Sequence, residues 1–213
     1  MTSSAPAPTP ASAPAPIVRC DMAISVDGFT TGLEAQKPPF RDDRFHRITS
    51  WVFDGEDATK LMHAERVDNT GAYVMGRRMY DSAGDYWSVE SPYRTHVFIV
   101  THRPQENIEL KDGTVFHFVT EGGVPAAIAA AKAVCPPGKR VHLSGGAAVV
   151  QQALAADLVD ELHLHITPVL VGQGNRLFDG LPDRMTELEA TRVIEAESGV
   201  MHLSYRIPRS QEG

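Results

Sequence analysis

The residues best suited to chemistry are two arginines that stand directly after a glycine. Gly76, Arg77 and Arg78 follow a short apolar run at 72–75, and this order predicts a buried strand, a glycine turn and then a helix. A helix that begins there directs unpaired backbone N–H groups and the positive end of its dipole outward. Together with two guanidinium groups, such a helix end suits a phosphate. The alternative is a solvated helix start that binds nothing.

A second glycine turn lies downstream of the first. An expected strand at 141–144 leads into Gly145 and Gly146, and Ala147 then opens a second helical segment. Because glycine has no Cβ, the backbone at such a turn can approach a ligand closely. The spacing differs from the GxGxxG fingerprint of Rossmann folds. Two such turns in one chain predict a ligand with more than one phosphate.

The composition fits one compact domain. The chain has 213 residues, 42% of them hydrophobic, which is enough for a sizeable core. A net charge of −7 argues against a general nucleic-acid binder. No apolar run reaches the length of a membrane span, and the N-terminus lacks the features of a secretory signal. The two cysteines, Cys20 and Cys135, imply no disulfide framework and predict a cytoplasmic protein.

The order of elements predicts an α/β fold. Residues 1–16 are an Ala/Pro-rich segment that we expect to be a disordered tail, followed by a single domain at 17–213. Alternating strands and helices, then a hairpin, predict a mostly parallel central sheet with helices on both faces and a C-terminal antiparallel hairpin. The expected strands span 17–25, 72–75, 95–101, 115–119, 140–143, 160–170, 186–197 and 200–207, and the expected helices span 43–53, 56–67, 77–83, 124–134 and 146–156, with a loop at 26–42.

Several segments together carry a family resemblance that covers most of the chain. The span from Ile17 to about Ile207 resembles the dihydrofolate reductase-like superfamily, especially stand-alone relatives of the reductase domain of bacterial riboflavin biosynthesis, the RibD C-terminal domain. The resemblance implies a dihydrofolate reductase-like fold, an NADPH cofactor and no metal. The segments that carry it are MAISVDGFTTG, DNTGAYVMGRRMYD, HVFIVTHRP, VHLSGGAAVVQQAL and DELHLHITPVLVGQGNRLFDG.

The resemblance assigns the two arginines and a later strand end to the cofactor phosphates. Arg77 matches the cofactor arginine of the family, and Arg78 is its neighbour. Met79 stands where dihydrofolate reductases usually have Thr, so one hydroxyl contact to the pyrophosphate is missing. Thr101 and Arg103 follow the strand whose end binds the adenosine 2′-phosphate in related enzymes, and a hydroxyl and a guanidinium suit that anion. An ordinary polar loop is the alternative for these two.

The end of the first strand is expected to border the nicotinamide. In related enzymes the backbone around Ala23 and Ser25 brackets the nicotinamide carboxamide, and the SxDG turn with Asp27 and Gly28 borders the active site. Asp27 is therefore the candidate catalytic residue, which would orient substrate, touch the cofactor or supply a proton. The competing interpretation is a turn carboxylate that binds only local backbone.

Two further regions are candidates for the substrate side. The loop 27–45 and the pair Tyr86-Trp87 fall beyond sheet ends, and an aromatic pair there would either stack a planar ring or belong to the core. His46 lies with Asp42, Asp43 and Arg44 where folate-type enzymes present their substrate side, although a charged helix N-terminus explains most of these residues.

His163 and His165 alternate with apolar residues on one expected strand and therefore share a face. Two imidazoles so placed would hold a metal if a third ligand joined them, but none is evident. We expect this face to meet solvent or a partner subunit instead.

The function that these observations favour is an NADPH-dependent reductase. Hydride would pass to a C=N, C=C or C=O carbon of a small substrate, heterocyclic compounds included, and the protein is expected to form a homodimer. Lys37 to Asp43 do not reproduce the substrate motif of folate enzymes, and no deaminase domain accompanies the chain. The alternatives are a nucleotide-binding sensor without turnover and, from the His-x-His strand alone, a metal-dependent hydrolase.

Overall fold

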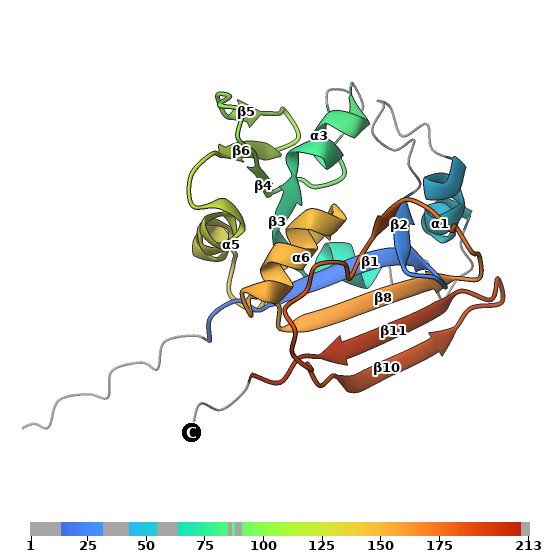
Figure 1. The fold of residues 1–213 in the computed structure, drawn as a ribbon. Helices are drawn as coiled ribbons and strands as arrows, with labels where there is room; N and C mark the ends of the chain where they lie inside the picture. The colour runs from blue at the N-terminus through green and yellow to red at the C-terminus, as the bar shows by residue number, and fades with distance from the viewer. Residues whose placement is uncertain (1–13, 32–42, 55–63, 85–86, 88–90, 210–213) are drawn as a thin grey trace, which may run out of the picture.

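A large mixed sheet forms the centre of the molecule. The computed structural model describes residues 14–31, 43–54, 64–84, 87 and 91–209. Among them, nine strands form the main sheet, in the order β10-β11-β8-β1-β7-β3-β4-β6-β5 (Figure 1). In chain order these are β1 (Val18–Ser25), β3 (Thr70–Gly76), β4 (His96–Val100), β5 (Ile108–Glu109), β6 (Val115–Val119), β7 (Arg140–Gly145), β8 (Glu161–Thr167), β10 (Glu189–Glu195) and β11 (Met201–Arg206).

The sheet is parallel in its middle and antiparallel at both edges. β8, β1, β7, β3, β4 and β6 run parallel to one another. β11 is antiparallel to both β8 and β10, which forms the expected C-terminal hairpin. At the other edge the short β5 is antiparallel to β6. The predicted fold class is therefore confirmed, with a second antiparallel edge that the sequence did not suggest.

Helices cover both faces of the sheet, because the side chains of the central strands alternate. Val18, Cys20, Met22 and Ile24 of β1 point to the main core, where they pack with α5 (Gly123–Val134) and α6 (Ala147–Ala155). The opposite face carries Arg19, Asp21, Ala23 and Ser25. There, α1 (Asp43–Asp54) and α3 (Arg77–Ala83) cover separate parts of the sheet through smaller clusters around Trp51 and Tyr73.

The element boundaries differ from expectation at a few places. The expected loop 26–42 contains β2 (Phe29–Thr31), which pairs antiparallel with β9 (Asn175–Arg176). The strand expected at 160–170 ends at Thr167, because Pro168 cannot donate to a sheet ladder. Of the helix expected at 56–67, residues 64–68 are helical and 56–63 lie outside the described residues. Most of the expected tail, residues 1–13, also lies outside them.

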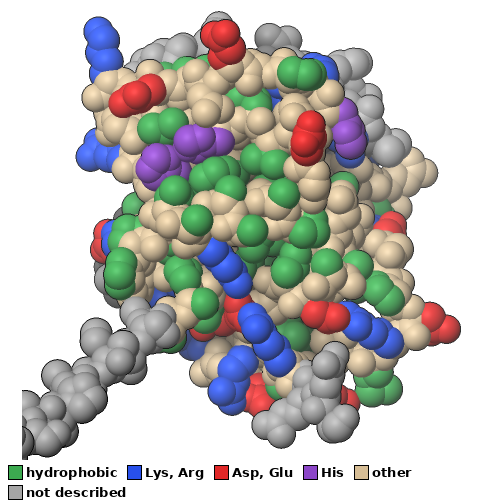
Figure 2. Space-filling model, turned by 90° about the vertical axis from the view of Figure 1, so that its left-hand side faces the viewer, with side chains coloured by type: hydrophobic (Ala, Val, Ile, Leu, Met, Phe, Trp, Pro, Cys, Tyr) green, Lys and Arg blue, Asp and Glu red, His purple; other side chains and the backbone are tan. Residues whose placement is uncertain are grey.

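The surface mixes apolar and charged regions. Figure 2 shows one face on which hydrophobic side chains gather across the middle, with Lys and Arg side chains below them. Across the described ranges, no helix is long and apolar enough to cross a membrane. Cys20 and Cys135 are both buried and both are free thiols, and burial raises the pKa of the Cys135 thiol.

Candidate active site

Two neighbouring strands part at the carboxyl edge of the sheet. β7 pairs with β1 up to Cys20 and Leu143, whereas β1 continues beside β8 as far as Ser25 and Thr167. On its other side, β7 stays paired with β3 up to Gly145. The carboxyl ends of β1 and β7 therefore separate. In open α/β sheets, ligands bind in such a crevice outside the carboxyl ends of strands.

The two predicted glycine turns lie next to each other at this edge. Gly76 ends β3 and caps α3, and Gly146 caps α6. A Cβ built on Gly76 would lie 3.8 Å from the Gly145 carbonyl oxygen and 3.8 Å from the Gly146 nitrogen. The turns are thus within contact distance, as expected for two parts of one binding site.

The glycines in the second turn differ in what they require. Gly145 has φ +98°, a conformation that favours glycine, and the peptide bond between Gly145 and Gly146 is cis. Gly146 has φ −66°, which any residue adopts, so its backbone alone does not demand glycine. A Cβ on Gly146 would meet nothing within 4 Å. The space beside Gly146, which is exposed, is therefore open, and Ala147 lies half-buried next to it.

The predicted phosphate arginines converge on a carboxylate that the sequence analysis did not single out. Arg77 Nε lies 2.7 Å from Asp81 Oδ1, and Arg103 Nη2 binds Asp81 Oδ2. The Arg77 guanidinium also lies over the rings of Tyr80 and Phe118, at 5.5 and 5.4 Å from their centroids. Asp81 therefore fixes two guanidinium groups that come from different strand ends. The i,i+4 spacing of Arg77 and Asp81 on a predicted helix was the available signal.

One donor of this cluster has no hydrogen-bond partner among the described residues. Arg77 Nη1 is buried and makes no hydrogen bond to any described residue, although its Nε is held by Asp81. Arg78 is exposed, beyond the cluster. A buried guanidinium N–H without an acceptor is costly, so a bound acceptor there would be favourable.

Thr101 organises the loop that carries Arg103. It follows β4, whose Val100 pairs with Gly76, so it lies beside the first glycine turn. Its hydroxyl accepts a hydrogen bond from the Arg103 N–H at 3.0 Å, and its own N–H donates to the Val119 carbonyl at 3.1 Å. Thr101 is buried. The structure thus brings Gly76, Arg77, Thr101 and Arg103 together.

Asp27 binds backbone and a neighbouring hydroxyl. The Ser25 hydroxyl donates to Asp27 Oδ1 at 2.6 Å, and the Val171 and Gly172 N–H groups donate to the same carboxylate, the latter at 2.8 Å. These hydrogen bonds, the one from Ser25 foremost, lower the pKa of Asp27 to about 2. Ser25 also accepts from the Phe29 N–H. The contacts are those of an ionised carboxylate that joins the first turn to the loop after β8.

The other nicotinamide-side residue, Ala23, lies two positions earlier on the same face of β1 as Ser25. It is partly buried and packs against the cluster around Trp51. Ala23 and Ser25 are on β1, where that strand has left β7, so their backbone lies beside the crevice. This places them on the opposite side of the crevice from Gly145.

The expected substrate-side residues fall into three groups: a buried aromatic residue, exposed residues of α1, and residues outside the described part of the chain. Trp87 is buried and donates from Nε1 to the Tyr80 carbonyl at 2.8 Å, so it belongs to the core rather than to a substrate wall. Tyr86 and Asp42 lie outside the described residues, as does the loop at 32–42. Asp43, Arg44 and His46 are exposed at the start of α1.

The expectation that His165 meets solvent or a partner is wrong. His165 is buried, its Nε2 lies 2.7 Å from Asp21 Oδ1, and its Nδ1 lies 2.6 Å from His202 Nδ1. Its ring centroid is also 4.2 Å from that of Trp51. Asp21 and His202 come from the neighbouring strands β1 and β11, which periodicity within one strand cannot reveal. Within the described part of the chain, no group of three or more His, Cys, Asp or Glu side chains could hold a metal.

The parallel sheet, its antiparallel hairpin and the paired turns at its carboxyl edge define an α/β domain of the dihydrofolate reductase-like type. Residues 16–202 match the family model of the RibD C-terminal domain, so the chain belongs to that family. It is 25% identical over 185 residues to the uncharacterized protein YyaP of Bacillus subtilis (strain 168), covering 87% of this chain and 92% of the relative.

Solved structures share the fold at low sequence identity. A putative riboflavin biosynthesis protein from Shewanella sp. PV-4 aligns with a TM-score of 0.65 and 21% identity, covering 91% of this chain and 99% of that one. A pyrimidine reductase-like protein from Corynebacterium diphtheriae aligns with a TM-score of 0.59 and 16% identity, covering 92% of this chain and 93% of that one. Acinetobacter baumannii RibD aligns with a TM-score of 0.60 and 15% identity, covering 92% of this chain and 59% of that protein. The chain therefore spans little more than half of RibD.

Proposed function

We propose that the protein is an NADPH-dependent reductase that transfers hydride to a C=N, C=C or C=O group of a small substrate. The observation that carries the proposal is the meeting of the two glycine turns where β1 and β7 part. Membership of the RibD C-terminal family supports the same activity, and the structural relatives include a pyrimidine reductase-like protein. Pyrimidine-type heterocycles are accordingly the first substrates to test.

The residues present fit a dinucleotide phosphate. The open space beside Gly146 would admit pyrophosphate close to the backbone, and the N-terminus of α6 begins there. Arg77 would offer its unpartnered Nη1 to a phosphate while Asp81 holds its Nε. Arg103, placed by Thr101 and Asp81, would be the second cation. This donor set favours NADPH over NADH, because NADPH carries an additional negative group, the adenosine 2′-phosphate.

NADPH, when bound, supplies the hydride from its nicotinamide ring. The backbone of Ala23 and Ser25 would orient that ring, and the separation of β1 from β7 would give it room. Asp27 would hold the turn against Val171 and Gly172. Because its pKa is about 2, Asp27 is ionised at neutral pH and is unsuited to donate a proton. We propose that water delivers the proton to the reduced substrate.

We also propose that the protein works as a homodimer in the cytoplasm. The dimer is inferred from the family resemblance and from the prevalence of two-fold assemblies. The location in the cytoplasm is inferred from the two buried free thiols of the protein, Cys20 and Cys135, which suit a reducing compartment.

The proposed reductase is tested by cofactor titration and turnover. Dissociation constants for NADPH and NADH are measured by protein fluorescence, and NADPH consumption is followed by absorbance with ribosylaminopyrimidine, pterin, imine and enone substrates. We expect tighter binding of NADPH and consumption with at least one substrate class. Tight binding without consumption would identify a nucleotide-binding sensor. Equal affinities would contradict the 2′-phosphate assignment.

A further inference from the structure

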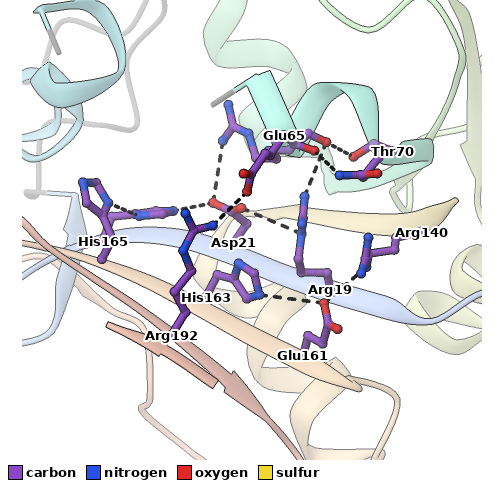
Figure 3. Close-up of polar contacts among 12 residues, drawn as sticks. Arg19, Asp21, Glu65, Thr70, Arg140, Glu161, His163, His165 and Arg192 are labelled. Carbon is purple, nitrogen blue, oxygen red and sulfur yellow. Dashed lines mark hydrogen bonds and ion pairs between the residues drawn. The ribbon is translucent and has the colours of Figure 1, made fainter. Parts of the chain in front are cut away.

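A polar pocket lies away from the proposed cofactor site, on the face of the sheet that carries Arg19 and Asp21. Its volume is about 290 Å³, close to the lower end of the sizes known for small-molecule sites, roughly 300–1,000 Å³. The floor comes from β1 and β8, one side from the helical residues 64–68, and the other from β10 and β11 (Figure 3). None of the residues assigned to the cofactor lines this pocket.

The wall of this pocket carries more positive than negative side chains. Of the described residues, four arginines and three carboxylates line it: Arg19, Arg66, Arg140 and Arg192, and Asp21, Glu65 and Glu161.

The carboxylates are engaged by three of the arginines. Arg192 Nη1 lies 2.9 Å from Glu65, and Arg140 Nε lies 3.3 Å from Glu161. Arg66 Nη1 lies 3.7 Å from Asp21, which His165 also contacts.

Arg19 is the arginine left with the weakest compensation. Its Nε is 4.0 Å from Asp21 Oδ2, beyond hydrogen-bonding distance, and its Nη2 reaches only the Arg66 carbonyl at 3.4 Å. The side chain is 6% exposed, and burial lowers the pKa of its guanidinium. A buried cation short of hydrogen bonds is unfavourable unless an anion accompanies it.

Unpartnered donors gather in the same pocket. Among the described residues, five buried side-chain N or O atoms have no hydrogen-bond partner, and three of them belong to residues that line it: Arg19 Nε, Trp51 Nε1 and Arg140 Nε. Arg140 Nε still lies 3.3 Å from Glu161 as an ion pair, so Arg19 Nε and Trp51 Nε1 are the donors with the clearer need. All three are N–H donors, and an indole N–H or a guanidinium cannot accept a hydrogen bond. Their shared requirement is for an acceptor, and the surplus positive charge selects an acceptor that is negative.

We propose that this pocket binds a small organic anion through a carboxylate or phosphate group. The oxyanion accepts hydrogen bonds from Arg19 and Trp51, and the rest of the molecule fills the space toward Arg140 and Arg192. One water molecule takes about 30 Å³ in the liquid, and a carboxylate or phosphate group takes only a few times that volume. The pocket therefore has room for more of the ligand than its oxyanion group. This site is separate from the proposed NADPH site, and it does not depend on the reductase activity.

The proposal is tested by the dependence of thermal unfolding on anion concentration, with ionic strength held constant by NaCl. Inorganic phosphate, acetate and succinate serve as probes, so that the arms distinguish phosphate from carboxylate ligands. We expect a saturable rise of Tm with at least one probe. Arg19→Gln and Trp51→Phe should each weaken the apparent affinity by about tenfold or more, the loss expected for a hydrogen bond to a charged group.

Arg206→Gln is the matched control, because it removes the same charge at an exposed ion pair with Glu189, and Arg206 does not line the pocket. Its affinity should stay within about twofold of the wild type, well short of the tenfold change. If Arg19→Gln fails to fold, the proposal is tested by Trp51→Phe and Arg140→Gln, each of which should weaken the anion affinity. The absence of saturation with every probe, or equal weakening by Arg206→Gln, overturns the proposal. NADPH affinity, measured on the same samples, reports separately on the proposed reductase.

Discussion

At the scale of single residues, Arg77 is where the cofactor assignment can be tested most directly. Arg77→Ala should weaken NADPH much more than NADH, because only NADPH carries the 2′-phosphate. The loss is expected to be about 1.5–3 kcal/mol, or roughly 10- to 150-fold in dissociation constant. Fluorescence titration with both cofactors measures it. Arg184→Ala, which removes a surface arginine paired with Asp157, is the control. A similar loss for both cofactors would show that Arg77 does not recognise the 2′-phosphate, since NADH carries the pyrophosphate but lacks that group.

Asp27 should behave as a structural carboxylate. Asp27→Asn removes the negative charge that the Ser25 hydroxyl and the Val171 and Gly172 N–H groups stabilise, so it should lower Tm. It should leave the pH dependence of turnover unchanged between pH 5 and 8, since a group with a pKa of about 2 does not titrate there. Loss of turnover at unchanged Tm, together with an altered pH profile, would instead make Asp27 a catalytic residue.

Residue types identified the arginines but not how they are held. The i,i+4 spacing indicates the pair of Arg77 and Asp81, but Arg103 is 26 positions from Arg77, and nothing in its local sequence indicates that it binds Asp81 as well. That pairing depends on β3 and β4 being neighbours in the sheet, which is a property of the topology. The same limit applies to His165, whose partners Asp21 and His202 come from other strands.

At the scale of elements, a glycine of the second turn, Gly146, can be compared with Gly71, a glycine of β3 that lies in close contact with the segment after α5. Gly146→Val should abolish NADPH binding while the protein stays folded, because the new side chain enters open space that the pyrophosphate is proposed to occupy. Gly71→Ala should lower the stability of the protein and leave the NADPH affinity of the folded protein unchanged. A Cβ on Gly71 would lie 2.6 Å from Cys135 Sγ and 2.6 Å from Pro136 Cδ, and overpacking of this kind costs about 1–3 kcal/mol.

Urea unfolding and NADPH titration on both variants separate these effects. Unchanged NADPH affinity in a folded Gly146→Val protein would show that this turn has only a structural role. Full stability in Gly71→Ala would show that the C-terminus of α5 yields more readily than its packing against β3 indicates.

Long, strongly patterned elements were predictable, and short ones were not. The central strands of the sheet are rich in apolar residues because both their faces are covered, and β3, β4, β6 and β7 appear within one or two residues of expectation. β2 and β9 were missed because each has only two or three residues and its partner lies about 145 positions away. Their pairing is fixed by contacts across the fold, not by periodicity.

At the scale of the whole molecule, buried histidines should make stability depend on pH. Burial lowers the pKa of His142 to about 3 and of His163 and His202 to about 4. Unfolded histidine titrates near pH ~6.5. Between about pH 6.5 and pH 4 the unfolded chain therefore binds protons that the folded chain does not, so the free energy of unfolding falls as pH falls. Above that window these groups add no slope.

Each such histidine contributes at most about 1.4 kcal/mol per pH unit. Urea unfolding between pH 4.5 and 7.5 measures the slope. His142→Asn should flatten it by up to one such increment, whereas His102→Asn, at an exposed position, should leave it unchanged. A flat profile in the wild-type protein would contradict the assignment of neutral buried imidazoles.

The assembly of the chain is the remaining prediction at this scale. Because His165 is buried within the protomer, the surface first considered for dimerisation is not centred on it. Exposed apolar side chains instead concentrate after β8, where Leu170 is 77% and Met185 87% exposed. Contiguous exposed apolar groups are typical of surfaces that meet a partner, and the partly exposed Phe178, Leu181 and Leu188 of the same segment line one groove. We expect a homodimer at micromolar concentration, and we expect residues 1–16 to contribute nothing, since they offer no sizeable apolar side chains to bury beyond Met1.

Light scattering on the full chain and on a chain beginning at Ile17 tests both expectations. Equal dimeric masses are the expected result, and Met185→Glu should shift the equilibrium toward monomer because it places a charge in an apolar contact. Lys132→Glu, a charge change on the distant α5, is the control. A monomeric full-length protein would refute the dimer, and loss of the dimer only in the shortened chain would assign the contact to the N-terminal segment.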